Sequence, residues 1–288
     1  MSHRKSFIFD WEAEQSLIFN VVELFLHLKV AFILCLCWCG RAHAGAWNQA
    51  AGQGQIISTS SWSHAGQIFD DDFEAVPLRG FTKTETRLYI EHGLTDWLTI
   101  VGNGAFQSLN FRDEDSRFDF DGLDDTELGL QFKVFAKEGL ATSIRVSYIV
   151  DSRLDNQAVD VLRGGDQYEL RGLIGQSRET LIGDLFYDAQ IAARTEQFSG
   201  LDGVQGALTL GIKPTDRWLI MTQNFLNFSN DDVRDGFDIP KQTQLVSQLS
   251  IARQYRPGRY IQLGAGRTIL GQNIVKERSV FIGLWTEY

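Results

Sequence analysis

The chain ends, over Ser279–Tyr288, with the stretch SVFIGLWTEY. Val280, Ile282 and Leu284 stand at every second position, and the last residue, Tyr288, is aromatic. Side chains two apart on a strand share one face, so the stretch predicts a β-strand with one apolar face. Soluble domains commonly end in a frayed, polar tail. A chain that finishes inside a strand therefore predicts that this strand is paired, and in a closed sheet its partner is the first strand.

The same alternation recurs through the chain after residue 44. In Thr126–Phe135, TELGLQFKVF, apolar residues occupy one face and glutamate, glutamine and lysine the other. Trp218–Phe228 fits least, because Met221 and Phe225 fall on the polar face. No apolar run there approaches the roughly 18 residues of a membrane helix. We expect twelve strands, beginning near Gln53, Phe81, Trp97, Asp125, Leu140, Asp166, Asp184, Val204, Arg217, Lys241, Tyr260 and Lys276.

The connections between these segments are of two kinds that take turns along the chain. Some are short, such as GLTD (Gly93–Asp96) and RPGR (Arg256–Arg259). Others are longer and acidic, such as Phe69–Gly80, Phe111–Asp125 and Asp151–Gly165. This order predicts antiparallel hairpins whose two ends differ. The 27 glycines and 4 prolines among 288 residues agree with many strands and tight turns.

Residues 1–44 resemble an export signal in their organisation. An apolar run, Val30–Gly40, contains all three cysteines and is followed by Ala42-His43-Ala44, which has the small-x-small form of a signal-peptidase site. We predict cleavage after Ala44, which leaves residues 45–288 as one domain without cysteine. An uncleaved anchor helix over Ser16–Gly40 is the alternative.

Alternating strands fit two architectures. In a secreted soluble β-sandwich the apolar faces pack on a second sheet. In an outer-membrane barrel the apolar face meets lipid and the polar face lines the lumen. The signal, the two kinds of connection and mid-strand charges of both signs favour the barrel. We therefore predict an all-β chain that forms a single antiparallel transmembrane β-barrel of about twelve strands, closed by its first and last strands because no backbone group can stay unpaired in hydrocarbon.

The terminal strand also resembles the carboxy-terminal strand of Gram-negative outer-membrane proteins, with Val280, Ile282, Leu284 and Tyr288 matching and Thr286 departing. The resemblance implies recognition by the barrel-assembly machinery. It also implies an outer-membrane location, with outer-membrane lipid and lipopolysaccharide as neighbours.

The whole chain after residue 44 resembles twelve-strand outer-membrane proteins of unknown substrate, some of which are linked to aromatic-degradation pathways. The elements that carry this resemblance are GAWNQAAGQGQ (Gly45–Gln55), the GLTD turn and the terminal strand. That family offers no defined substrate residues to carry over.

The polar faces supply the candidate site. We expect a small-solute channel or transporter whose charged side chains line the lumen, where they set selectivity. The alternative is a structural charge network that plugs a closed barrel. The predicted lining residues are Lys83, Glu85, Arg87, Arg145, Glu169, Arg171, Asp188 and Arg194.

Catalysis is a minor hypothesis. Ser63 stands beside His64, which invites comparison with barrel enzymes that hydrolyse lipids. Adjacent residues on a strand point to opposite faces, and the sequence shows no third orienting group. We predict no catalytic site and no cofactor, with a lipid-modifying barrel kept as an alternative. The net charge of −10 offers no surface for nucleic acid.

The acidic stretch Asp113–Asp125 is not an EF-hand, since Arg117 and Leu128 occupy positions where calcium loops need Asp and Glu. We predict no metal site, and loose bridging of divalent cations to lipopolysaccharide phosphates is the alternative. The candidates for aromatic girdles at the membrane surfaces are Trp47, Trp97, Trp218, Trp285, Tyr89, Tyr148, Tyr187 and Tyr260, and for Trp285 the alternative is the lumen.

Overall fold

A computed structural model describes residues 45–288, apart from 113–116, 151–165, 197–201 and 235–236. The elements in these ranges are all β-strands. Among the described residues no helix is long and apolar enough to cross a membrane. The predicted signal peptide and its alternative, an anchor helix, lie outside the described residues.

Twelve strands form the barrel, and eleven of them begin within two residues of the expected position. They are β1 (Gly54–Phe69), β2 (Ala75–Thr95), β3 (Leu98–Arg112), β5 (Thr126–Lys137), β6 (Leu140–Val150), β7 (Gln167–Thr180), β8 (Gly183–Glu196), β9 (Gly203–Thr215), β10 (Trp218–Ser229), β13 (Gln242–Arg256), β14 (Arg259–Gln272) and β16 (Arg278–Glu287). The exception is β2, which starts six residues before Phe81 because the stretch after Glu74 continues the pairing with β1 past an irregularity between Ala65 and Gln67.

The sheet is closed by its first and last strands. Every barrel strand pairs antiparallel with its neighbours, and β1 pairs with β2 on one side and β16 on the other. At the end of this seam the Gly54 N–H donates to the Tyr288 carbonyl (2.9 Å), and the Tyr288 N–H donates to the Gly54 carbonyl (3.0 Å). The expected closed barrel is therefore confirmed, and the two-sheet sandwich is excluded, since the strands form one continuous ring.

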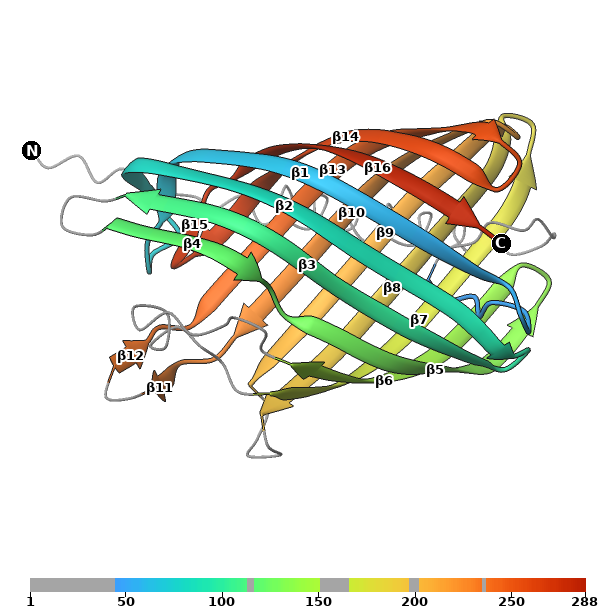
Figure 1. Ribbon diagram of the computed structural model, residues 1–288, viewed down its shortest axis with the longest axis horizontal. Helices are drawn as coiled ribbons and strands as arrows, with labels where there is room; N and C mark the ends of the chain where they lie inside the picture. Colours follow the sequence, from blue (N-terminus) through green and yellow to red (C-terminus); the bar gives the residue numbers. More distant parts are fainter. Residues whose placement is uncertain (1–44, 113–116, 151–165, 197–201, 235–236) are drawn as a thin grey trace, which may run out of the picture. The chain divides into compact units, whose positions relative to one another are not determined.

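The two ends of the barrel differ as the connections predicted (Figure 1). All five connections at one end, here called the turn end, are two residues long. In one of them Glu138 and Gly139 both have positive φ (52° and 82°), as a type I′ hairpin turn requires.

The opposite end, here called the loop end, carries the longer connections and four additional short strands. These are β4 (Arg117–Leu123), β11 (Asp232–Arg234), β12 (Phe237–Ile239) and β15 (Ile274–Val275). The long acidic connection expected over Phe111–Asp125 is partly a strand, because β4 extends the sheet by pairing with β3.

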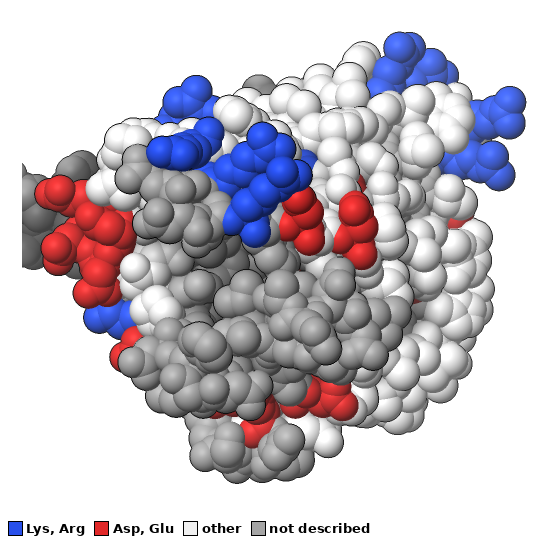
Figure 2. Space-filling model, turned by 60° about the vertical axis from the view of Figure 1, so that its left-hand side comes forward, with Lys and Arg blue, Asp and Glu red and all other residues white. Residues whose placement is uncertain are grey.

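The outer face of the barrel is apolar. The exposed side chains along three neighbouring strands, β5, β6 and β7, include Leu128 (60%), Leu130, Val146 and Leu170 (58%). In Figure 2 the flank between the two ends is nearly free of charged side chains. Such a belt is what a lipid-facing surface requires.

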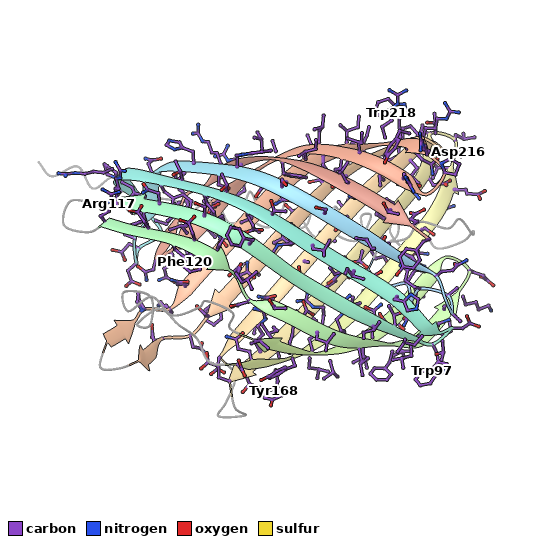
Figure 3. All side chains as sticks on the ribbon, viewed as in Figure 1. Trp97, Arg117, Phe120, Tyr168, Asp216 and Trp218 are labelled. Atoms are coloured by element: carbon purple, nitrogen blue, oxygen red, sulfur yellow. The ribbon has the colours of Figure 1, made fainter. Side chains whose placement is uncertain are left out.

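Outward-facing aromatic residues flank this belt (Figure 3). Trp97 stacks on Phe132 at the turn end, where Trp218 also lies, with the Arg253 guanidinium 5.2 Å from its ring centroid. Tyr148 and Tyr168 form a pair toward the loop end, with ring centroids 5.3 Å apart.

Four of the eight girdle candidates face the interior instead. Trp47 packs against the buried Ala46, Ala141 and Leu173. Tyr89, Tyr260 and Trp285 line the lumen, which corrects the first two and confirms the alternative placement of Trp285. A period-two pattern does not separate these tyrosines from girdle residues, since an aromatic ring with a polar tip suits both positions.

Candidate functional site

A cavity of about 1080 Å³ occupies the lumen. Its lining side chains come from alternate positions of the barrel strands, which is the geometric consequence of the period-two pattern. Of the eight predicted lining residues, Lys83, Glu85, Arg87, Arg145, Arg171, Asp188 and Arg194 contact the cavity directly. The eighth, Glu169, points inward but is fully covered by the two arginines that bind it.

The charged residues are concentrated on one side, here called the charged wall. It consists of the lumen-facing ionised side chains of β2, β5, β6, β7 and β8: Lys83, Glu85, Arg87, Glu91, Glu127, Arg145, Glu169, Arg171, Asp188 and Arg194. Within this wall most charges are already paired.

One cluster is centred on Glu169. Arg171 binds its carboxylate in a bidentate manner (2.7 and 2.9 Å), and Arg194 Nε adds a third contact at 2.8 Å. The remaining Arg171 N–H groups donate to the side-chain oxygens of Gln190 and Gln205, each at 3.1 Å. Bidentate arginine–carboxylate pairs are among the strongest and most directional ionic contacts, so this cluster fixes three neighbouring strands to one another.

A second cluster surrounds Arg145. Its guanidinium donates to the side-chain oxygen of Gln131 (2.7 and 3.1 Å) and lies 3.7 Å from Glu91 and 3.9 Å from Glu127. Tyr89 donates to Glu91 and accepts a hydrogen bond from Arg145. Nearly the whole cluster is buried, and a buried charge needs such partners to be tolerated.

Nearer the loop end, a third cluster is more open. Arg87 binds Glu85 at 3.0 Å and Asp124 at 3.5 Å, and Lys83 lies 3.6 Å from Glu277. The Arg87 side chain is 35% exposed, which leaves it in contact with the cavity.

The described residues immediately before β1 turn back into the barrel. This inner segment, Gly45–Gln53, continues from β1 at the turn end (Figure 1). The Asn48 side chain donates to the Gln131 carbonyl (2.8 Å), and the Gln49 side chain donates to Glu91 (2.8 Å). A Cβ placed on Gly175 would lie 2.4 Å from the Trp47 ring, so only glycine leaves room for this indole. The inner segment thus rests against strands of the charged wall and narrows the lumen there.

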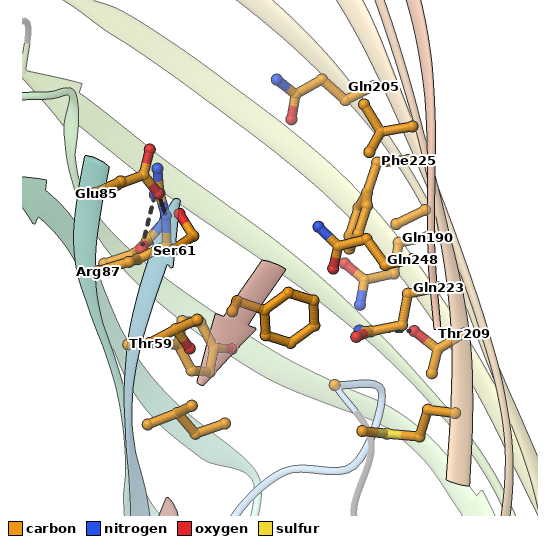
Figure 4. Close-up of a pocket in the computed structure, with 18 of the residues that line it drawn as sticks. Thr59, Ser61, Glu85, Arg87, Gln190, Gln205, Thr209, Gln223, Phe225 and Gln248 are labelled. Carbon is orange, nitrogen blue, oxygen red and sulfur yellow. Dashed lines mark hydrogen bonds and ion pairs between the residues drawn. The ribbon is translucent and has the colours of Figure 1, made fainter. Parts of the chain in front are cut away.

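The opposite side of the lumen is different, and we call it the neutral wall. It consists of the uncharged lining side chains of β9, β10 and β13: Gln205, Ala207, Thr209, Leu219, Met221, Gln223, Phe225, Asn227, Gln244, Val246 and Gln248. Lys213, near the end of β9, is the charged member of the lining on these strands. Figure 4 shows Gln205, Phe225, Gln248, Gln223 and Thr209 across the cavity from Glu85, Arg87, Thr59 and Ser61.

The side-chain amides of this wall are largely unused. Gln223 reaches Thr209 at 3.5 Å, whereas Asn227, Gln244 and Gln248 form no side-chain hydrogen bond with any described residue. Each amide offers two donor hydrogens and one acceptor oxygen. The neutral wall therefore presents free hydrogen-bonding groups to whatever fills the cavity.

Toward the turn end the neutral wall becomes apolar. Leu219, Met221 and Ala252 form a buried cluster with Phe186, and Trp285 packs against it. This explains why Trp218–Phe228 fitted the alternation poorly, since its lumen-facing residues are themselves apolar there. Phe281, also on the lumen side, lies over Gly264, where a Cβ would come within 2.2 Å of the ring.

The residues weighed for other chemistry are not brought together. Ser63 is buried on the lumen side, whereas His64 is exposed on the outer face. Within the described ranges, no group of three or more His, Cys, Asp or Glu side chains is placed to hold a metal ion. The residues proposed for assembly, Val280, Ile282, Leu284 and Tyr288, are 38–56% exposed.

The fold has known counterparts, although the sequence does not. No protein-family model matches the chain, and no curated protein matches it. An outer-membrane channel from Pseudomonas putida F1 superposes with a TM-score of 0.63 at 11% identity, covering 86% of this chain and 100% of that one. The transport unit of the autotransporter AIDA-I from Escherichia coli gives a TM-score of 0.50 at 11% identity, covering 86% of this chain and 93% of that one. The described chain thus has the fold of a Gram-negative outer-membrane β-barrel.

Proposed function

We propose that this protein is an outer-membrane channel that admits small, uncharged, hydroxyl-bearing solutes through its lumen. The observation that carries the proposal is the contrast between paired charges on one wall and free amides on the other. The printed name of the structural neighbour from Pseudomonas putida F1, an outer-membrane channel, supports the same class of function.

The cavity has a suitable size for such a solute. Small-molecule sites in proteins commonly occupy roughly 300–1,000 Å³, and this cavity is about 1080 Å³. A passing solute must replace the hydrogen bonds that it loses to water, but must not bind so tightly that it cannot leave. Several weak amide and hydroxyl contacts in series meet both requirements.

In this proposal the charged wall has a structural role and the neutral wall contacts the solute. The predicted lumen residues Arg145, Glu169 and Arg171 act as scaffold, because each already has an ionic partner within the charged wall. Solutes contact Gln223, Gln244 and Gln248, with Thr59 and Ser61 of β1 opposite. Charged solutes gain little from the charged wall, since most of its charges already have partners.

Single-channel recording in planar bilayers tests this. The purified protein is expected to give a steady ionic current that a neutral sugar, added at increasing concentration, reduces or interrupts. The double variant Gln244→Leu/Gln248→Leu should keep the current and lose most of the sugar effect. Gln67→Leu, at an exposed position outside the cavity lining, is the matched control and should behave as the wild type.

The two parts of the proposal fail separately. Absence of current at all voltages overturns the channel and favours a closed structural barrel. A current that sugar does not affect, or that the double variant leaves equally sensitive, overturns the solute class alone.

A further inference from the structure

Asp188 is a buried carboxylate that has no cationic partner among the described side chains. It is 2% exposed and lies on the lumen face of β8. Its Oδ2 accepts the Ala46 N–H at 2.8 Å, and its Oδ1 accepts a hydrogen from Gln190 at 2.6 Å. No described lysine or arginine forms an ion pair with it. A buried charge whose hydrogen-bond partners are both neutral is costly.

The buried side chains around Asp188 also include more carboxylates than cations. Glu91, Glu127 and Asp188 are at most 9% exposed, and Arg145 is the guanidinium buried among them. Gln131 connects the group, because its amide donates to the Gly45 carbonyl (2.8 Å) and its oxygen accepts from Arg145. Three carboxylates thus face one guanidinium around the start of the inner segment.

We propose that removal of residues 1–44 supplies the missing charge, as an α-ammonium group on Gly45 that forms a buried ion pair with Asp188 and fastens the inner segment in the lumen. Hydrolysis of the Ala44–Gly45 peptide bond by a signal peptidase consumes one water. It leaves a carboxylate on Ala44, which departs, and an ammonium group on Gly45.

The geometry places Gly45 within reach of the carboxylate. The next residue, Ala46, already donates its N–H to Asp188. A Cβ built on Gly45 would lie 3.7 Å from Asp188 Oδ1 and 2.7 Å from Gln190 Nε2. Because glycine has no Cβ, the Gln190 amide keeps its place beside Asp188. Export and docking are thereby coupled, since the group that fastens the segment exists only after cleavage.

The test uses protein purified from outer membranes. Mass spectrometry of its N-terminal peptide should show a chain that begins at Gly45. The folded protein is then treated with an amine-acetylating reagent at neutral pH. The Gly45 amine should stay unmodified in the wild type and become modified in Asp188→Asn, whose amide oxygen can still accept the Ala46 N–H. Lys137, with a 70% exposed side chain, should be modified in both and serves as the internal standard.

A second readout follows the segment itself. The mature chain has no cysteine, so Ala46→Cys introduces a single, buried thiol. Its reaction with a maleimide should be roughly 5- to 30-fold faster when Asp188→Asn is added, as expected for losing one or two kilocalories of docking free energy. Asp184→Asn, on the same strand, should leave the rate unchanged.

A third form keeps Asp188 and moves the ammonium. Two extra alanines are placed before Gly45 in the refolded Ala46→Cys chain. Its thiol should react with the maleimide as fast as it does when Asp188→Asn is added. This extended chain replaces the Asp188→Asn variant in the test if that variant does not fold. A mature chain that starts elsewhere overturns the proposal, as does equal labelling of the extended and authentic chains.

Discussion

The charged wall and the neutral wall face the same lumen but use their polar groups in opposite ways. On the charged wall, Glu169 holds Arg171 and Arg194, and the Arg145 cluster receives the inner segment. On the neutral wall, the side chains of Asn227, Gln244 and Gln248 form no hydrogen bond with any described residue. A polar residue that faces the lumen is therefore not available to a solute by its orientation alone. What matters is whether its hydrogen-bonding capacity is still free after folding.

The largest expected effect comes from breaking the charged wall at its centre. Glu169→Gln leaves two inward-facing guanidinium groups without their counter-charge, and removing one partner of a buried pair typically costs about 3–5 kcal/mol. The unfolding free energy in detergent, or the temperature at which the folded gel band disappears, should fall accordingly. Gln248→Ala on the neutral wall should change either quantity far less. If both variants lose the same unfolding free energy, the charged wall is not the structural one.

A smaller effect is expected from expelling the inner segment while sparing both walls. A Cβ at Gly175 lies 2.4 Å from the Trp47 ring, and overpacking of this kind typically costs about 1–3 kcal/mol. Gly175→Leu should therefore undock the segment and raise the single-channel conductance by widening the lumen. At Gly102 a Cβ meets nothing within 4 Å, so Gly102→Ala is the control. An unchanged conductance in Gly175→Leu would mean that the segment does not limit the passage.

The smallest effect is expected at the seam, which belongs to neither wall. Tyr288 stacks on His92 with centroids 6.0 Å apart, and aromatic pairs contribute about 0.5–1.5 kcal/mol beyond the area that they bury. Tyr288→Ala should lower stability by about that amount and slow the appearance of the folded form during assembly in cells. If assembly proceeds at the wild-type rate, the role proposed for the terminal aromatic in recognition by the assembly machinery is wrong.

Much of the fold could be predicted because a single physical rule generates it. Alternation at period two separates lipid-facing from lumen-facing residues, and it gave the strands and the closed ring. The rule failed in Trp218–Phe228, where Met221 packs against other apolar residues inside the barrel. An apolar lumen removes the contrast on which the pattern depends.

The candidate site could be predicted only as a set of inward-facing charges. Which charges pair depends on the register between strands, and register is not visible in one sequence. The inner segment was missed as a lumen element for the same reason. GAWNQAAGQGQ has no periodicity, and its partners lie far away along the chain, as in the Ala46–Asp188 contact across 142 positions.

The seam between β1 and β16 joins the two ends of the sheet. β1 can pair with β16 only once β16 is in place, so closing the ring requires both ends of the sheet. The inner segment is tethered directly to β1, and once the ring is shut no strand edge remains through which it could be threaded. It therefore enters either before closure or through the mouth at the turn end, and its direct link to β1 keeps it beside that mouth in both cases.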